Sequence, residues 1–211
     1  IFSSSATVYG NINESPFKED DKIGIGITNP YGKTKYMIEQ ILMDFTISNP
    51  KIKIISLRYF NPIGCHPSGL IGENPNNTPN NLIPYILNVA YKNNIDNTLE
   101  GYDFLNIYGK DYNTIDGTAS RDYIHVMDVA RSHIIALEKI EKLNSNYNTF
   151  NIGFGKGITV LELVKLFEKV NNIKVPHIFS ERRDGDLAET YCNSSKSKIL
   201  LEFIPKYNVT D

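Results

Sequence analysis

An isoleucine-rich apolar run at residues 52–60 follows a segment with helical periodicity at residues 31–45. Pro30 stands at a helix-start position, and apolar side chains recur every three or four residues from Met37 to Phe45. A short, continuous apolar run is typical of a strand that is buried on both faces. Together with an earlier strand that closes at the serines of residues 3–5, this succession indicates a parallel α/β sheet.

The second half of the sequence predicts shorter, mixed elements. Residues 64–79 are rich in Gly, Pro and Asn and indicate a long irregular loop. We expect helices at residues 82–92, 126–143 and 160–171, and strands at 105–108, 123–126 and 149–152. The expected division is a parallel-sheet domain in residues 1–62 and a smaller mixed α/β domain in residues 63–211. Some segments from about 105 to 150 are expected to return to the first sheet.

Composition narrows the classes of partner. The 211 residues include 22 Lys and Arg against 24 Asp and Glu, so no general positive charge favours nucleic acid or an acidic membrane surface. No apolar run approaches the length of a membrane span. The two cysteines, Cys65 and Cys192, lie far apart and have no metal-ligand spacing, so we expect neither a disulfide framework nor a metal site. These features favour a cytoplasmic protein.

Tyr31 and Lys35 are the first candidates for chemistry. They are four residues apart at the start of the predicted helix, so an ammonium can lie beside a phenol and stabilise its phenolate form. Taken alone, such a pair is more often two solvated neighbours. However, Ser5 closes a strand where a parallel sheet opens its ligand crevice, and its hydroxyl can bond the same reacting oxygen as the tyrosine.

Six ordered motifs extend this pattern across nearly the whole chain. They are FSSSATVYG at 2–10, NPYGKTK at 29–35, LRYFNP at 57–62 with HPSG at 66–69, NNL at 80–82, SRDYIHV at 120–126 and RRDGD at 182–186. In this order the motifs resemble the UDP-glucose 4-epimerase family of extended short-chain dehydrogenases. The resemblance implies a Rossmann-like parallel sheet, partial in this chain, with a smaller mixed α/β substrate-binding domain.

The resemblance also implies roles for individual residues. Tyr31 would be the catalytic acid and base, Lys35 would support it, and Ser5 would bridge to the sugar hydroxyl. The residues implied at the NAD cofactor are Ser5, Tyr31, Lys35, Tyr59 and Phe60. Those implied at the UDP-hexose are Ser5, Ala6, Thr7, Tyr59, Phe60, Asn61, Asn80, Asn81, Leu82, Asn106, Ile107, Tyr108, Arg121, Arg183, Asp184, Gly185, Asp186 and Thr190.

Arginine suits the diphosphate, because its planar donors meet phosphate oxygens bidentately. For Arg121 or Arg183 taken singly, a surface salt bridge to Asp122 or Asp184 would be the ordinary explanation. Members of this family interconvert UDP-glucose and UDP-galactose by transient oxidation at C4 with tightly bound NAD. The resemblance further implies a homodimer in which the helix at residues 31–45 packs against its symmetry mate.

Two features of the sequence depart from the family pattern. No GxGxxG turn precedes Ser3, and GFGKG at residues 153–157 follows a strand in the wrong context, so we expect about 100 residues of NAD-binding βαβ units upstream. A last helix is expected to follow residue 211. We therefore expect the chain to be part of a longer protein, and we expect this part to be inactive without the upstream NAD-binding segment. Thr190 stands where family members restricted to unsubstituted sugars have a tyrosine, which suggests that N-acetylated UDP-sugars also fit.

Other functions stay open. A related nucleotide-sugar dehydratase would carry acidic residues after the active-site hydroxyl, whereas Ala6, Thr7 and Val8 follow Ser5 here. Epimerases that act on UDP-glucuronate or UDP-pentoses are harder to exclude from the sequence. A non-catalytic sensor of NAD or nucleotide sugars would have no need of Ser5, Tyr31 and Lys35 together.

Overall fold

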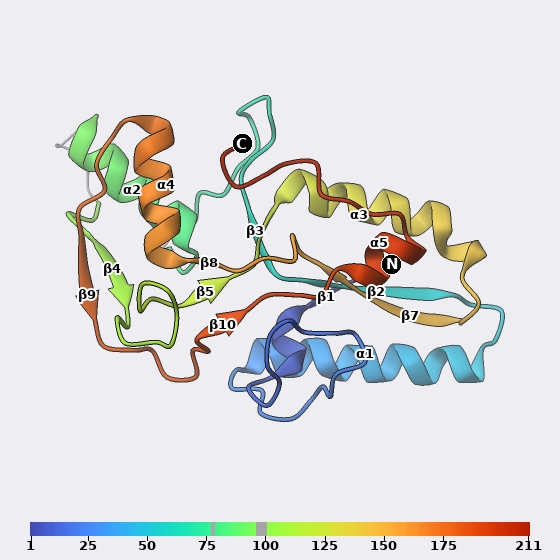
Figure 1. Ribbon diagram of the computed structural model, residues 1–211. Coiled ribbons are helices and arrows are strands. Elements are labelled where there is room, and N and C mark those ends of the chain that lie inside the picture. Colours follow the sequence, from blue (N-terminus) through green and yellow to red (C-terminus); the bar gives the residue numbers. More distant parts are fainter. Residues whose placement is uncertain (77–78, 96–100) are drawn as a thin grey trace.

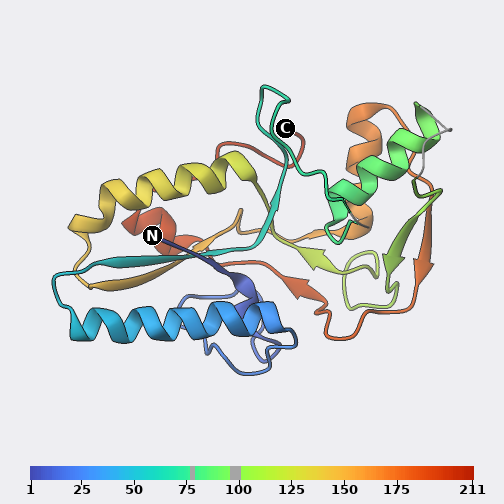
Figure 2. The ribbon, with the colours of Figure 1, turned by 180° about the vertical axis from the view of Figure 1, so that it is seen from behind.

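The computed structural model describes residues 1–76, 79–95 and 101–211. Its first lobe is built on a parallel sheet in the order β1-β2-β7, formed by β1 (Phe2–Ser5), β2 (Ile54–Tyr59) and β7 (Tyr147–Ile152). Helices α1 (Pro30–Ser48) and α3 (Val126–Lys139) cover opposite faces of this sheet (Figures 1 and 2). A short 3-10 helix, η2 (Ile140–Lys142), ends α3.

The core of this lobe lies between the sheet and α3. Ile55 and Leu57 of β2 pack with Phe150 and Ile152 of β7, and all four are inaccessible to solvent. Ile55 and Leu57 belong to the apolar run at residues 52–60, which the sequence predicts as a buried strand, and the other two belong to the predicted strand at 149–152. Burying such side chains is the main stabilising contribution to a sheet covered by helices.

Helix α1 begins where Asn29 accepts a 2.7 Å hydrogen bond from the backbone N–H of Gly32, with Pro30 in the first turn. Its apolar stripe does not pack on the sheet as a core-facing stripe would. Met37 and Ile41 are 59% and 63% exposed, whereas Glu39 is buried. The sheet of the described chain therefore holds α1 by few apolar contacts.

The second lobe has two layers (Figure 1). Helices α2 (Leu82–Asn94) and α4 (Val160–Asn171) pack over the parallel pair β4 (Leu105–Tyr108) and β9 (His177–Ser180). Three short strands lie between the lobes in the order β10 (Glu189–Thr190), β5 (Ser120–Arg121) and β8 (Ile158–Thr159). The remaining elements are η1 (Ala6–Tyr9), the pair β3 (Asn61–Ile63) and β6 (Tyr123–His125), and α5 (Ser195–Leu200).

The expected return of the chain to the first sheet occurs in α3 and β7. In contrast, β4 pairs with β9 in the second lobe, so the segment at 105–108 does not return. Residues 64–76 and 79 form no helix or strand, as expected for the loop, and residues 77 and 78 lie outside the described chain.

The chain runs between the two lobes in four segments, and Asp122, which lies in one of them, forms hydrogen bonds to the other three. Its backbone carbonyl accepts from Asn61 N–H at 2.9 Å, and its backbone N–H donates to the carbonyl of Thr190 at 3.0 Å. The carboxylate accepts backbone N–H bonds from the loop after β7 at 2.6 and 2.9 Å, and from Cys192 at 3.2 Å. Burial raises the pKa of this carboxyl despite these donors. The GFGKG loop at residues 153–157 therefore has a structural role, which is to bind the Asp122 carboxylate through its backbone N–H groups.

Candidate active site

A cavity of about 1000 Å³ lies between the lobes, at the carboxyl ends of β1 and β2. Ligands of open parallel sheets bind at such an edge. Residues from distant parts of the chain meet there. The predicted site residues that line it are Ser5, Thr7, Tyr31, Phe60, Asn61, Asn80, Asn81, Leu82, Asn106, Tyr108, Arg121, Arg183 and Asp186.

Ser5 and Tyr31 face this cavity from two adjoining elements. Ser5 is the last residue of β1 and the N-cap of η1, where its hydroxyl oxygen accepts from Thr7 N–H at 3.3 Å and from the Thr7 hydroxyl at 3.0 Å. Tyr31 opens helix α1 and is 55% exposed. A fixed serine hydroxyl and an accessible phenol therefore share one wall of the cavity.

Lys35 lies one helical turn behind Tyr31. Its Nζ is 5.4 Å from the centre of the Tyr31 ring and donates a 2.9 Å hydrogen bond to the backbone carbonyl of Ser3. The ammonium is thus beside the phenol, as the spacing predicts, although Lys35 does not line the cavity itself.

Tyr59 and Phe60 end strand β2 and point in different directions. Phe60 lines the cavity. The Tyr59 hydroxyl donates to the Ser3 hydroxyl at 2.9 Å and lies 2.5 Å from Nε2 of His133 on α3. Burial raises the pKa of Tyr59 despite the bond to Ser3. Tyr59 therefore lies on the face of the sheet that α3 covers, outside the cavity.

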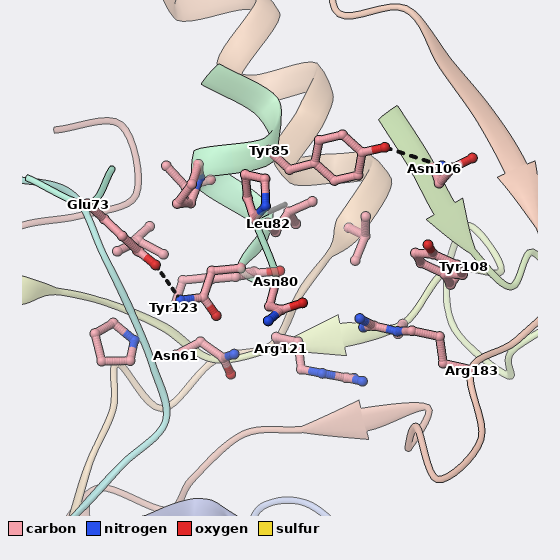
Figure 3. Close-up of a pocket in the computed structure, with 18 of the residues that line it drawn as sticks. Asn61, Glu73, Asn80, Leu82, Tyr85, Asn106, Tyr108, Arg121, Tyr123 and Arg183 are labelled. Carbon is pink, nitrogen blue, oxygen red and sulfur yellow. Dashed lines mark hydrogen bonds between the residues drawn. The ribbon is translucent and has the colours of Figure 1, made fainter. Parts of the chain in front are cut away.

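Arg121 and Arg183 also line the cavity (Figure 3), and both contact the carboxylate of Asp186. Arg121 Nη2 lies 3.5 Å from one oxygen of Asp186, and Arg183 Nε lies 3.0 Å from the other. Arg121 is further held by two 2.8 Å bonds to backbone carbonyls, one of them from Leu187. Neither arginine forms an ion pair with Asp122 or Asp184 among the described contacts, so the ordinary salt bridges considered from the sequence are wrong. Two guanidinium groups converge on the cavity instead.

Four amide side chains also line the cavity. Asn81 donates to Glu73 at 2.6 Å, and Asn106 donates to the Tyr85 hydroxyl at 3.2 Å (Figure 3). Asn61 and Asn80 also face the cavity. These groups provide hydrogen-bonding partners for a polar ligand that spans both lobes.

Several predicted residues lie elsewhere. Ile107 belongs to the core between β4 and the helices of the second lobe, because side chains alternate along a strand. Besides Lys35 and Tyr59, the other predicted residues that do not line the cavity are Ala6, Asp184, Gly185 and Thr190. Thr190 pairs in register with Arg121 in the β10–β5 ladder, directly beside the cavity wall.

Sequence reasoning missed six polar or aromatic residues that line the cavity: Glu73, Tyr85, Tyr102, Asp103, Phe104 and Tyr123. Tyr123 stands inside the motif at residues 120–126, so its place could have been found there. Burial raises its pKa to about 12, against the opposing charges of Arg121 and Arg183. Nothing in the sequence distinguishes Glu73 from other loop carboxylates, and the helical period gives Tyr85 no special position.

Comparison with known proteins agrees with this arrangement. The model of the NAD dependent epimerase/dehydratase family matches residues 1–153. The chain belongs to this epimerase/dehydratase family. It is 48% identical over 203 residues to UDP-glucose 4-epimerase of Pasteurella multocida, a match that covers 96% of this chain and 57% of that protein.

Solved structures of family members have the same fold. A UDP-glucose 4-epimerase from Stenotrophomonas maltophila, with bound NAD and formylated UDP-arabinopyranose, is 41% identical, has a TM-score of 0.90, and matches 100% of this chain and 59% of its own. One from Bifidobacterium longum, in complex with NAD⁺ and UDP, is 42% identical with a TM-score of 0.88 and the same coverage. The chain therefore spans less than two thirds of the length of these relatives.

The donor set fits the nicotinamide end of the family's cofactor. Hydroxyls of Ser5 and Tyr31 and the ammonium of Lys35 suit ribose oxygens, and the Phe60 ring offers an apolar surface. Within the described residues, no helix is long and apolar enough to cross a membrane. The same residues contain no cluster of His, Cys, Asp and Glu that could hold a metal ion.

Proposed function

We propose that the whole protein interconverts UDP-glucose and UDP-galactose, with NAD as a tightly held cofactor. One observation carries this proposal. Ser5 and Tyr31 line the same cavity as Arg121 and Arg183. One cavity thus holds a hydroxyl pair that suits proton transfer and a pair of cations that suits a diphosphate.

The roles of the side chains follow from their positions. Tyr31 would accept the proton of the C4 hydroxyl and later return it, while Ser5 bonds the same oxygen. Lys35 would hold a positive charge beside the phenol throughout. When bound, NAD takes the C4 hydride and gives it back. Arg121 and Arg183 would hold the diphosphate while the hexose presents either face to Tyr31.

The other readings have less support. A dehydratase would need an acidic residue after Ser5, and Ala6 and Thr7 stand there. A non-catalytic sensor would not need Tyr31 exposed to the cavity with Lys35 beside it.

The whole protein should convert UDP-galactose to UDP-glucose without added reductant or oxidant. Coupled detection of UDP-glucose is the measurement. Absence of turnover by NAD-loaded protein that binds UDP would overturn the proposal.

Substrate range is a second part of this proposal, and Thr190 carries it. Thr190 lies next to Arg121 in the β10–β5 ladder, and a threonine leaves room that a tyrosine would fill. The whole protein should therefore also interconvert UDP-GlcNAc and UDP-GalNAc. Thr190→Tyr should abolish the N-acetyl activity and keep turnover of UDP-galactose, with Thr190→Ser as the matched control. The idea fails if the unchanged protein does not turn over UDP-GalNAc.

We also propose that the whole protein is a cytoplasmic homodimer. The exposed apolar side chains of α1, such as Met37 and Ile41, support a surface that another copy or an upstream segment covers. The free thiols of Cys65 and Cys192 fit a reducing compartment. Sedimentation of the whole protein should give a dimer at micromolar concentration, and a monomer alone would remove the idea.

A further inference from the structure

The face of α1 that meets the sheet is unusual because it buries an acidic side chain. The buried residues of this helix are Gly32, Glu39 and Thr46, while its large apolar side chains are mostly exposed. Glu39 is 1% exposed. A carboxylate at such a position is costly unless it is fully paired, so its partners show what it does there.

Glu39 has a complete set of partners from two strands of the sheet. Arg58 of β2 donates to both of its oxygens, from Nε at 3.0 Å and from Nη2 at 2.7 Å. The Ser4 hydroxyl of β1 donates at 2.5 Å to the oxygen that Nε also contacts. Arg58 is 2% exposed, and its bonds to Glu39 outweigh the effect of burial and raise its pKa. The contact between the two side chains is therefore bidentate.

The contacts continue into the third strand. Arg58 Nη1 donates to the Tyr9 hydroxyl at 2.9 Å, and this hydroxyl donates to Asn151 Oδ1 of β7 at 2.7 Å. Asn151 in turn donates to the carbonyl of Phe17 at 2.9 Å. A chain of hydrogen bonds thus runs from α1 through β1 and β2 to β7, each member being fixed by the next.

This chain of bonds is attached directly to the residues of the active site. Glu39 follows Lys35 by one helical turn and Tyr31 by two, so it lies on the same side of α1. Ser4 immediately precedes Ser5. The Glu39 carboxylate therefore joins the element that carries Tyr31 to the element that carries Ser5.

We infer that Glu39 is a positioning residue, which, with Ser4 and Arg58, fixes α1 on β1 so that Tyr31 and Ser5 address the same oxygen. The inference rests on the proposed function for its kinetic consequence. Stability alone is a poor account of the pair, because buried ion pairs can often be replaced by apolar residues without loss. A hydrogen-bonded ion pair has a defined geometry and therefore fixes the orientation of the helix. Apolar contacts are not directional and fix this orientation less tightly.

Two variants of the whole protein test the inference. Glu39→Gln keeps the shape but removes the charge, and Ser4→Ala removes only the bond from β1 and leaves the ion pair. Asp44→Asn, on the exposed side of the same helix, is the matched control. The kcat for UDP-galactose is expressed per UDP-binding site from calorimetric titration, so loss of folded protein does not count as loss of rate. The isotope effect on kcat is measured with substrate deuterated at C4.

Displacement of Tyr31 should slow the chemical step without weakening the diphosphate contacts of Arg121 and Arg183. We expect kcat per site to fall about 10-fold or more in Glu39→Gln and less in Ser4→Ala, with an increased isotope effect and little change in KM. Asp44→Asn should match the unchanged protein. Partial unfolding would lower the total rate and leave the isotope effect as it was.

Unchanged kcat per site and isotope effect in both variants would overturn the inference. If Glu39→Gln fails to fold, Ser4→Ala decides the matter by the same measurements. If the unchanged protein has no epimerase activity, the proposed function fails, and crystal structures then test positioning by themselves. An α1 that keeps its place on β1 in both Glu39→Gln and Ser4→Ala would refute the inference, whereas a shifted Tyr31 would support it.

Discussion

Tyr31 is the residue on which the proposed chemistry depends. Its exposed phenol lies beside Lys35 and in the cavity with Ser5. In the whole protein, Tyr31→Phe should lower kcat by about 10² to 10⁴, the usual contribution of a general acid and base. Tyr36→Phe on the same helix is a control that keeps the Tyr31 hydroxyl. Near-normal turnover by Tyr31→Phe would contradict the assignment.

The two cysteines should differ in reactivity. Cys65 is exposed, whereas Cys192 is buried, and burial together with the nearby Asp122 raises the pKa of the Cys192 thiol. The thiolate is the reactive form, so iodoacetamide at neutral pH should modify Cys65 and spare Cys192 until the protein is unfolded. Peptide mapping by mass spectrometry is the measurement. Equal labelling of both residues in the native protein would show that Cys192 is accessible.

The sequence predicts those site residues that belong to recognisable motifs. Ser5, Tyr31 and Arg121 line the predicted cavity because each follows from a motif and an element. Ile107 shows the limit of that reasoning, since neighbouring positions on a strand face opposite sides. Glu73 shows another, because only folding brings a carboxylate of the loop against Asn81.

At the scale of elements, the start of α4 gives a test of a helix cap. The Thr159 hydroxyl oxygen accepts from Glu162 N–H at 3.1 Å, and its proton is donated to Asp116 at 2.5 Å. Partial burial raises the pKa of Asp116, but the bonds from Thr159 and Thr118 outweigh this effect and hold the pKa below its usual value. Thr159→Val should lower the free energy of unfolding by about 1 to 2 kcal/mol at neutral pH.

The pH dependence of that loss has a definite sign. Because the pKa of Asp116 is depressed by folding, its contribution is complete above the unfolded pKa of about 3.9 and disappears as pH falls through the folded value. The difference between the protein and Thr159→Val should therefore narrow below about pH 4. Thr159→Ser keeps the hydroxyl and serves as the control in urea denaturation. If the difference in the free energy of unfolding stays constant across this pH range, the bond between Thr159 and Asp116 does not contribute to the effect of the cap.

The sequence predicts the helices and strands that have a clear hydrophobic periodicity, but it does not predict the shortest strands. Strand β4 at Leu105–Tyr108 has the predicted bounds, and α2 and α4 begin at the predicted residues. Strands β5 and β10 have two residues each, too few for any period, and depend on pairing across long sequence distances. Helix α1 was predicted correctly as a helix, but its apolar stripe does not face the described sheet.

At the scale of the whole molecule, Asp122 should matter more for stability than its size suggests. Three backbone N–H groups donate to its carboxylate. Asp122→Asn puts an amide donor against some of these N–H groups, so the free energy of unfolding should fall by about 1 to 3 kcal/mol. Asp184→Asn, at an exposed position, should change it by less than about 0.5 kcal/mol. Equal stability of the two variants in urea would contradict this account.

The bonds around Asp122 also bear on how the molecule moves. All four segments of the chain between the lobes are linked through one residue, so a torque that parts the lobes must break several of its bonds in a single event. We therefore expect the two lobes to move little relative to one another at this junction. We expect ligand entry to depend instead on exposed side chains that line the cavity, such as Arg183, which is 54% exposed.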